Sequence, residues 1–148
     1  IFKSCSIKKK IVETDEKEMG IRKILNFGHT FAHAYEATLG YSKKLNHGEA
    51  VILGIKTAAK FSLSNNILSD KEFKLIENHL NKLSLPKNIN KFFSIKNLNK
   101  ILYFMKKDKK NNTNKINLVL LKKIGSPIYK QQFDEKKINL FLKKELIK

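Results

Sequence analysis

The chain carries the stretch GIRKILNFGHTFAHAYEATLG at residues 20–40, and this stretch predicts a central helix on which polar and apolar side chains are separated. At about 100° per residue counted from Glu18, an ideal helix turns a set of polar side chains to one narrow face. They are Glu18, Arg22, Asn26, His29, His33 and Glu36. Phe31 and Ala32 fall elsewhere and can pack against the body of the protein. One side of this segment is therefore expected to face a cavity.

This central helix is expected to run from about Ile21 to Leu39. Gly40 follows it, in the position where a left-handed glycine commonly ends a helix. Gly20 and Gly28 are the positions at which the helix can break or bend, because glycine adopts backbone conformations that other residues avoid.

The remainder of the chain predicts a mainly α, multi-helix domain with a short β-hairpin near residues 115–130. Its 148 residues and 41% hydrophobic content suit one domain with a real core. Residues 111–114 read as an exposed turn. Hydrophobic spacing and capping residues predict helices over about 48–64, from Ser69 up to Pro86, over about 98–105, and after Asp134.

Composition argues against a nucleic-acid partner in spite of a formal net charge of +18. The basic residues are 30 Lys and one Arg, and the chain also holds 15 Asn and 17 Ile, all types with A- and T-rich codons. We attribute most of the charge to genome composition, because a nucleic-acid site is expected to use arginine. The one arginine, Arg22, lies instead among the polar residues above.

The chain shows no sign of a membrane or secreted protein. No apolar run approaches the roughly 20 residues that span a bilayer, and the start has no signal-peptide layout. Cys5 is the single cysteine, so it is expected to be a small semi-buried residue in a reducing compartment. These features predict a soluble, cytoplasmic piece of a longer protein.

Three of the four histidines gather within 19 residues. His29 and His33 lie one helical turn apart, a spacing that can share a metal ion, and His47 could supply a third nitrogen. A surface pair is the alternative, but the neighbouring Arg22 and Asn26 favour a site. The residues by themselves predict a cationic, histidine-bearing pocket for a metal ion and an anionic small molecule.

Two longer strings resemble the 3-dehydroquinate synthase family. Residues 18–36 contain LNFGHTFxHAxE, and residues 47–51 read HGEAV in the right order and at nearly the right separation. Segments around Ile7-Lys8, 15–18 and 108–110 also align with the family. The resemblance covers essentially all of residues 1–148, but only the C-terminal, mainly helical domain of the family. The N-terminal NAD-binding domain is absent from this chain.

The resemblance implies an enzyme of the shikimate pathway. The full enzyme would convert 3-deoxy-arabino-heptulosonate 7-phosphate to 3-dehydroquinate plus phosphate, by transient oxidation with NAD, phosphate elimination, reduction and an intramolecular aldol closure. A divalent metal, zinc or a substitute such as cobalt, would hold the hydroxyl that is oxidised. The family also implies a homodimer and an N-terminal NAD-binding domain of the same protein as partners.

The resemblance also implies roles for single residues. His29 and His47 match two metal ligands, and the third ligand is a Glu upstream of Ile1. His33 matches a substrate-contacting histidine. The remaining substrate-binding positions are Lys8, Glu18, Arg22, Asn26 and Lys109, with Lys110 as an alternative register for Lys109. The catalytic set is Lys8, Arg22, Asn26 and His33.

Three points stay open from the sequence. Glu49 could accept a hydrogen bond from His47 if His47 binds a metal ion, or it could stabilise the start of its helix. Another sugar-phosphate cyclase or a metal-dependent polyol dehydrogenase of the same fold would share part of the histidine pattern. A basic, non-catalytic nucleic-acid-binding module is the third hypothesis.

Overall fold

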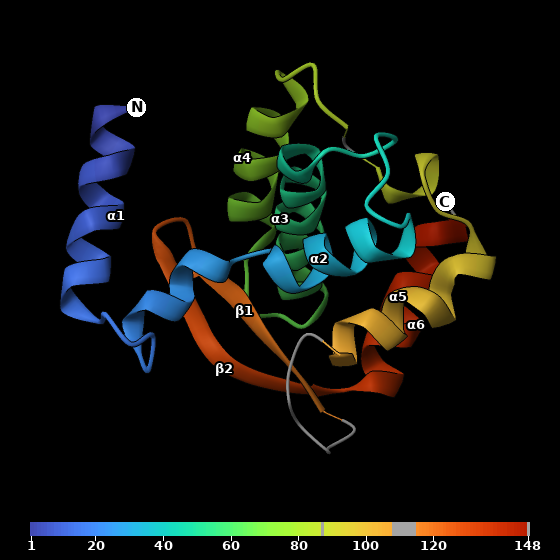
Figure 1. The fold of residues 1–148 in the computed structure, drawn as a ribbon. Helices are drawn as coiled ribbons and strands as arrows, with labels where there is room; N and C mark the ends of the chain where they lie inside the picture. The colour runs from blue at the N-terminus through green and yellow to red at the C-terminus, as the bar shows by residue number, and fades with distance from the viewer. Residues whose placement is uncertain (87, 108–114, 148) are drawn as a thin grey trace.

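The computed structural model describes residues 1–86, 88–107 and 115–147. It is mainly helical with one β-hairpin, as predicted. Figure 1 shows the elements in chain order: α1 (Phe2–Thr14), η1 (Ile21–Asn26), α2 (His29–Thr38), α3 (His47–Ser64), α4 (Asp70–Asn81), η2 (Ile89–Lys91), η3 (Ile95–Asn97), α5 (Leu98–Lys107), β1 (Lys115–Lys123), β2 (Ser126–Asp134) and α6 (Glu135–Ile147).

The core forms around α2, which contacts both α3 and α5, while α3 also lies against β1 and α4. Phe31 of α2 is buried against Phe61 of α3, with ring centroids 6.4 Å apart, and the buried Tyr35 lies against Phe93, with ring centroids 5.1 Å apart. Ile101 and Met105 of α5 are fully buried in the same cluster. Helix α2 is thus held on several sides, which fixes the polar residues that it carries.

The continuous helix expected over residues 21–39 is wrong, because the chain breaks at Gly28. Ile21–Asn26 form the 3-10 helix η1, and α2 starts only at His29. Between them Gly28 has φ 82°, in the left-handed region that glycine enters without strain. The predicted placing of side chains at about 100° per residue therefore applies from His29 onward and fails for the residues before Gly28.

Helices α2 and α3 touch backbone to backbone where Gly28 meets Gly54. A Cβ placed on Gly28 would lie 2.5 Å from the backbone N of Ile55, and one placed on Gly54 would overlap the carbonyl O of Gly28. Gly54 is buried within α3. Glycine at these two positions lets the helices approach more closely than any other residue would allow.

The cap predicted at Ser69 forms, and the structure adds a cap at Asn46. Asn46 and Glu49 make a reciprocal capping box at the start of α3, and the Ser69 side chain accepts a hydrogen bond from the backbone N of Glu72 at the start of α4. Helix α4 ends at Asn81, somewhat earlier than the expected stop near Pro86. The caps fix where the helices begin, and so where residues such as His47 stand.

The hairpin of β1 and β2 is confirmed as an antiparallel pair, with Leu120 opposite Ile128 and Gly125 at φ 81° in the connecting turn. Strand β1 packs its buried residues toward α3. There the buried Ser62 hydroxyl donates to the carbonyl O of Ala58 at 2.8 Å and accepts from the backbone N of Leu121 at 3.1 Å.

Helix α1 was not predicted, and it has no buried residue. It stands beside the rest of the molecule and contacts η1 (Figure 1). Cys5 lies on it and is exposed, so the semi-buried position expected from the sequence is wrong. Nothing on the part of the chain described here forms a helix long and apolar enough to cross a membrane. The exposed turn predicted at residues 111–114 lies outside the described residues.

Candidate functional site

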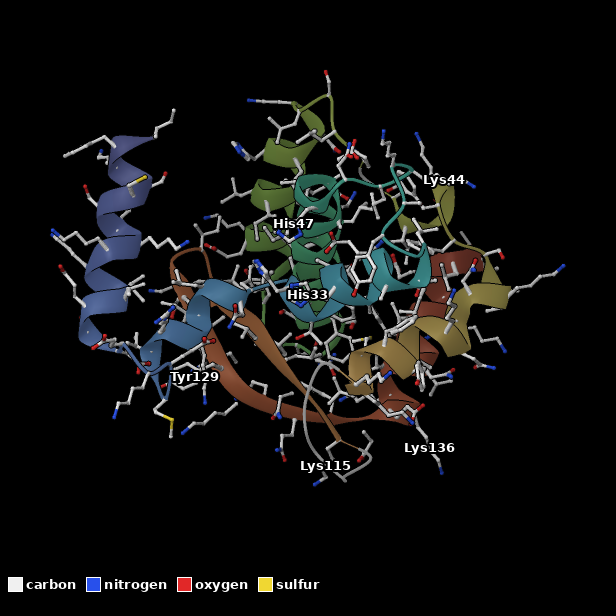
Figure 2. All side chains as sticks on the ribbon, viewed as in Figure 1. His33, Lys44, His47, Lys115, Tyr129 and Lys136 are labelled. Atoms are coloured by element: carbon white, nitrogen blue, oxygen red, sulfur yellow. The ribbon has the colours of Figure 1, made fainter. Side chains whose placement is uncertain are left out.

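Three histidine rings gather where the start of α3 lies beside α2. His29 is the first residue of α2, His33 lies one turn later, and His47 is the first residue of α3. The ring centroids are 5.6 Å apart for His29 and His33, and 6.4 Å apart for His47 and either of the other two. Figure 2 shows His33 and His47 between the two helices. The fold therefore brings together residues that are 18 positions apart in the sequence.

His47 is held from the neighbouring helix by Glu36. Both carboxylate oxygens of Glu36 lie 3.1 Å from Nδ1 of His47. The Glu36 side chain is 12% exposed, whereas that of His47 is 64% exposed. A carboxylate accepts hydrogen bonds, so His47 donates through Nδ1–H and leaves the lone pair of Nε2 free.

His29 adopts the same tautomer as His47, with a different hydrogen-bond partner. Its Nδ1 lies 3.3 Å from the carbonyl O of Phe27, the residue just before the left-handed Gly28. A carbonyl oxygen can only accept, so Nδ1 of His29 carries the proton and Nε2 is again the free nitrogen. Metal-ligating histidines usually donate their second ring N–H to a carbonyl or carboxylate in this manner.

The two rings suit a shared metal ion but do not complete a site. Bonds of about 2.0–2.1 Å from zinc to two imidazoles place the ring centres about 5–6 Å apart. The distance between His29 and His33 is 5.6 Å and lies within this range, whereas the 6.4 Å between His29 and His47 lies slightly above it. Among the described residues, no group of three or more His, Cys, Asp or Glu side chains could hold a metal ion. His29 and His47 could therefore supply two ligands to a metal ion.

Glu18 and Asn26 meet across the turn that precedes α2. The Asn26 amide donates from Nδ2 to Oε1 of Glu18, and Glu18 has φ 54°, a left-handed conformation that is uncommon for a glutamate. The predicted placing of both on one continuous helix face is wrong. They nonetheless come together, because the loop curls back on itself.

Asp15 organises the same loop around Arg22. Its carboxylate accepts hydrogen bonds from the backbone N of Met19 at 2.9 Å, Gly20 at 2.7 Å and Arg22 at 3.0 Å. These bonds, with the one from Arg22 the largest contribution, lower the pKa of Asp15. The Arg22 guanidinium donates to the carbonyl O of Glu16. Both the backbone and the side chain of Arg22 are therefore hydrogen-bonded to residues 15–16.

Of the two lysines of the predicted site, only Lys8 lies in the described part of the chain, and it is not brought to the histidines there. Lys8 is exposed on α1, and within the described ranges no hydrogen bond or ion pair joins it to Arg22, Asn26 or His33. Lys109, with its alternative Lys110, lies outside the described residues. The site that the structure assembles therefore rests on α2, α3 and the loop before them.

Glu49 serves the start of α3, which decides between its two predicted roles. Its carboxylate accepts from the backbone N of Asn46 at 2.9 Å. The carboxylate that contacts His47 is instead that of Glu36, which was predicted only to lie on the polar face. A signal existed: Glu36 lies seven residues after His29, two helical turns away on the same face.

Comparison with known proteins shows the family of this chain. The family model described as 3-dehydroquinate synthase C-terminal matches residues 1–111. The 3-dehydroquinate synthase of Pelagibacter ubique (strain HTCC1062) is 77% identical over 148 residues, which are 100% of this chain and 40% of that relative. The 3-dehydroquinate synthase of Endomicrobium trichonymphae is 43% identical, covering 86% of this chain and 34% of the relative. The chain thus spans about two fifths of the length of its curated relatives.

Solved structures share the fold. A 2-deoxy-scyllo-inosose synthase complexed with carbaglucose-6-phosphate, NAD+ and Co2+ superimposes with a TM-score of 0.75 at 23% identity, over 95% of this chain and 39% of that chain. A second structure of a 2-deoxy-scyllo-inosose synthase gives a TM-score of 0.64 at 21% identity, over 88% of this chain and 34% of that chain. Since the family model spans most of the sequence, the chain belongs to the 3-dehydroquinate synthase C-terminal family.

Proposed function

We propose that residues 1–148 form the C-terminal domain of a 3-dehydroquinate synthase that acts in the cytoplasm as a homodimer. The full-length enzyme would convert 3-deoxy-arabino-heptulosonate 7-phosphate to 3-dehydroquinate and phosphate, with NAD bound by its N-terminal domain. Family membership and the 77% identity to a protein of that name support the proposal. The observation that carries it is the pair His29 and His47, each with Nδ1 engaged and Nε2 free.

His29 and His47 would hold the divalent metal through their Nε2 atoms, with a third ligand from the part of the enzyme that precedes this chain. When bound, zinc or cobalt supplies a Lewis acid for the hydroxyl that is oxidised. The similar 2-deoxy-scyllo-inosose synthase was solved in complex with Co2+ and NAD+, which is consistent with this pair of cofactors.

Arg22 is proposed to bind the carboxylate of the substrate. Its guanidinium matches a carboxylate through two parallel hydrogen bonds, and Asp15 fixes the backbone from which it extends. Asn26 is oriented by Glu18, so its amide has a defined direction before substrate arrives. Binding groups that are held in place beforehand lose less entropy when the substrate binds.

His33 is proposed to hold or move a proton at its imidazole ring. It lies one turn from His29 and its ring centroid is 5.6 Å from that of His29, so it can reach a substrate placed beside the metal ligands. Lys8 and Lys109 are proposed to bind the phosphate end of the substrate. Lys8 would do so from α1, once the domain that precedes this chain is in place.

The deciding experiment measures phosphate release from 3-deoxy-arabino-heptulosonate 7-phosphate by the full-length protein with NAD, while NADH is followed by absorbance. The proposal expects phosphate without net NADH, lost on chelation and restored by zinc or cobalt. Accumulating NADH without phosphate would indicate a polyol dehydrogenase instead. Release of phosphate with a different carbocyclic product would indicate another sugar-phosphate cyclase.

Arg22→Ala tests the substrate site separately from the metal. Removing the partner of a desolvated carboxylate costs about 3 kcal/mol, so kcat/KM should fall by about 100-fold or more. Lys23→Ala removes a charge from the neighbouring position and serves as the matched control. Near-normal kinetics for Arg22→Ala would show that the carboxylate is bound elsewhere.

A further inference from the structure

We infer that Glu36 is a positioning residue that fixes the tautomer and the ring orientation of His47, and thereby sets the affinity of the site for its metal ion. The inference rests on the proposed function, because it takes His47 as a metal ligand. It goes beyond that function by assigning a role to a carboxylate that belongs to neither the proposed metal ligands nor the proposed substrate-binding residues.

The contact is symmetric and spans two helices. Both carboxylate oxygens of Glu36 on α2 lie 3.1 Å from Nδ1 of His47 on α3, so the N–H points between them. An imidazole that donates through Nδ1 presents its lone pair at Nε2, on the opposite side of the ring. The carboxylate thus selects the tautomer that a metal ion requires at Nε2.

The backbone of His47 is fixed, whereas its ring is open to solvent. The capping box of Asn46 and Glu49 holds the backbone at the first position of α3, but the His47 side chain is 64% exposed. The remaining freedom lies in the two side-chain torsions of His47. Since Glu36 is only 12% exposed and extends from the well-packed helix α2, it offers a rigid anchor for those torsions.

The charge of Glu36 adds a second effect. A carboxylate bonded to Nδ1–H increases the electron density of the ring and makes Nε2 a stronger ligand. An amide at this position would keep an oxygen that accepts from Nδ1–H but would lose the charge. Glu36→Gln and Glu36→Ala therefore separate the two effects, because the first removes charge and the second also removes the anchor.

The test measures metal affinity of the full-length apoprotein with Zn2+ or Co2+, in competition with a chromophoric chelator. We expect affinity to fall about 10-fold in Glu36→Gln and about 100-fold in Glu36→Ala, the range for such partners of metal ligands. Glu49→Gln is the matched control, because it makes the same change two residues from His47. Glutamine can still complete the capping box that holds the His47 backbone, so metal affinity should be unaltered. Circular dichroism confirms that each variant is folded.

Nitrogen-15 NMR of the apoprotein supplies a readout that a purely structural role would not move. Wild type should show His47 protonated at Nδ1, and Glu36→Ala should show a mixture of the two tautomers. Wild-type metal affinity in Glu36→Ala, or an unchanged tautomer, would overturn the inference. His47→Ala separates the role of Glu36 from the metal site itself. If His47→Ala also leaves metal affinity unchanged, the proposed metal site is wrong. If only His47→Ala loses affinity, the metal site stands and the role of Glu36 is refuted.

Discussion

Replacing Gly54 by alanine is expected to force helices α2 and α3 apart. The new Cβ would overlap the carbonyl O of Gly28 and lie 2.9 Å from the backbone N of Ala32 and 3.1 Å from its Cβ. These atoms belong to backbone or to a rigid methyl group, so no side-chain rotation relieves the contact. The helices must separate by roughly 1 Å to restore an ordinary separation of about 3.5 Å.

The magnitude follows from two opposing terms. Alanine stabilises a helix interior by up to about 1 kcal/mol relative to glycine. Overpacking costs about 1–3 kcal/mol, and a clash with backbone belongs in the upper part of that range, so the net loss should be about 1–2 kcal/mol in the free energy of unfolding. The same displacement moves His29 relative to His47, and a metal site tolerates only about 0.5 Å of such movement. Metal affinity should therefore fall together with stability.

The assay is urea unfolding of the full-length protein together with metal competition. Gly48→Ala is the matched control, because Gly48 lies on the same helix and an added Cβ there meets nothing within 4 Å. This control should be neutral or slightly stabilising. A Gly54→Ala protein as stable as the Gly48→Ala protein, with unchanged metal affinity, would refute the claim that glycine sets the distance between the two helices.

Two further predictions concern single hydrogen-bonded groups. Backbone N–H groups, that of Arg22 foremost, lower the pKa of Asp15. Its carboxylate should therefore stabilise the loop above about pH 4 and lose that effect as the pH falls through the lowered pKa. In unfolding experiments from about pH 7 to about pH 3, the stability advantage of wild type over Asp15→Asn should shrink on the acid side. Burial raises the pKa of Tyr35, whose hydroxyl donates to Oγ1 of Thr57 at 3.0 Å. The stability of wild type should therefore fall as the pH rises above about 10, whereas that of Tyr35→Phe should not. At pH 7, calorimetry should show that Tyr35→Phe lowers the free energy of unfolding by about 1 kcal/mol.

Local sequence signals predicted most of the fold. Ser69 with Glu72 acts over a few residues, so the start of α4 could be predicted without any tertiary information. Asn46 with Glu49 is an equally local pair at the start of α3, but only a possible helix-start role of Glu49 was predicted. The alternation in β1 likewise predicted the hairpin. The central helix failed because periodicity assumes an unbroken helix, while the left-handed Gly28 redirects the chain so that α2 can contact Gly54.

The clustering of the histidines could be predicted from the sequence, but the contacts around them could not. His29 and His47 were named from the motif, and the structure brings their rings together. The partner of His47 depends on how α2 and α3 pack, and spacing along one helix could not show that Glu36 would face it. Helix α1 carried no amphipathic signal strong enough to predict, since none of its residues is buried.

The hydroxyl of Ser62 has a consequence for how this protein stays dispersed. Strand β1 is rich in leucine and isoleucine, and within the described part of the chain β2 is the strand paired with it, along one of its edges. An uncovered edge of such a strand is a template on which other chains add and aggregate. By accepting the N–H of Leu121, Ser62 gives this buried backbone donor of β1 a partner from within the molecule. A serine of helix α3 thus occupies a strand N–H, 59 residues away in the sequence, that would otherwise be left to pair elsewhere.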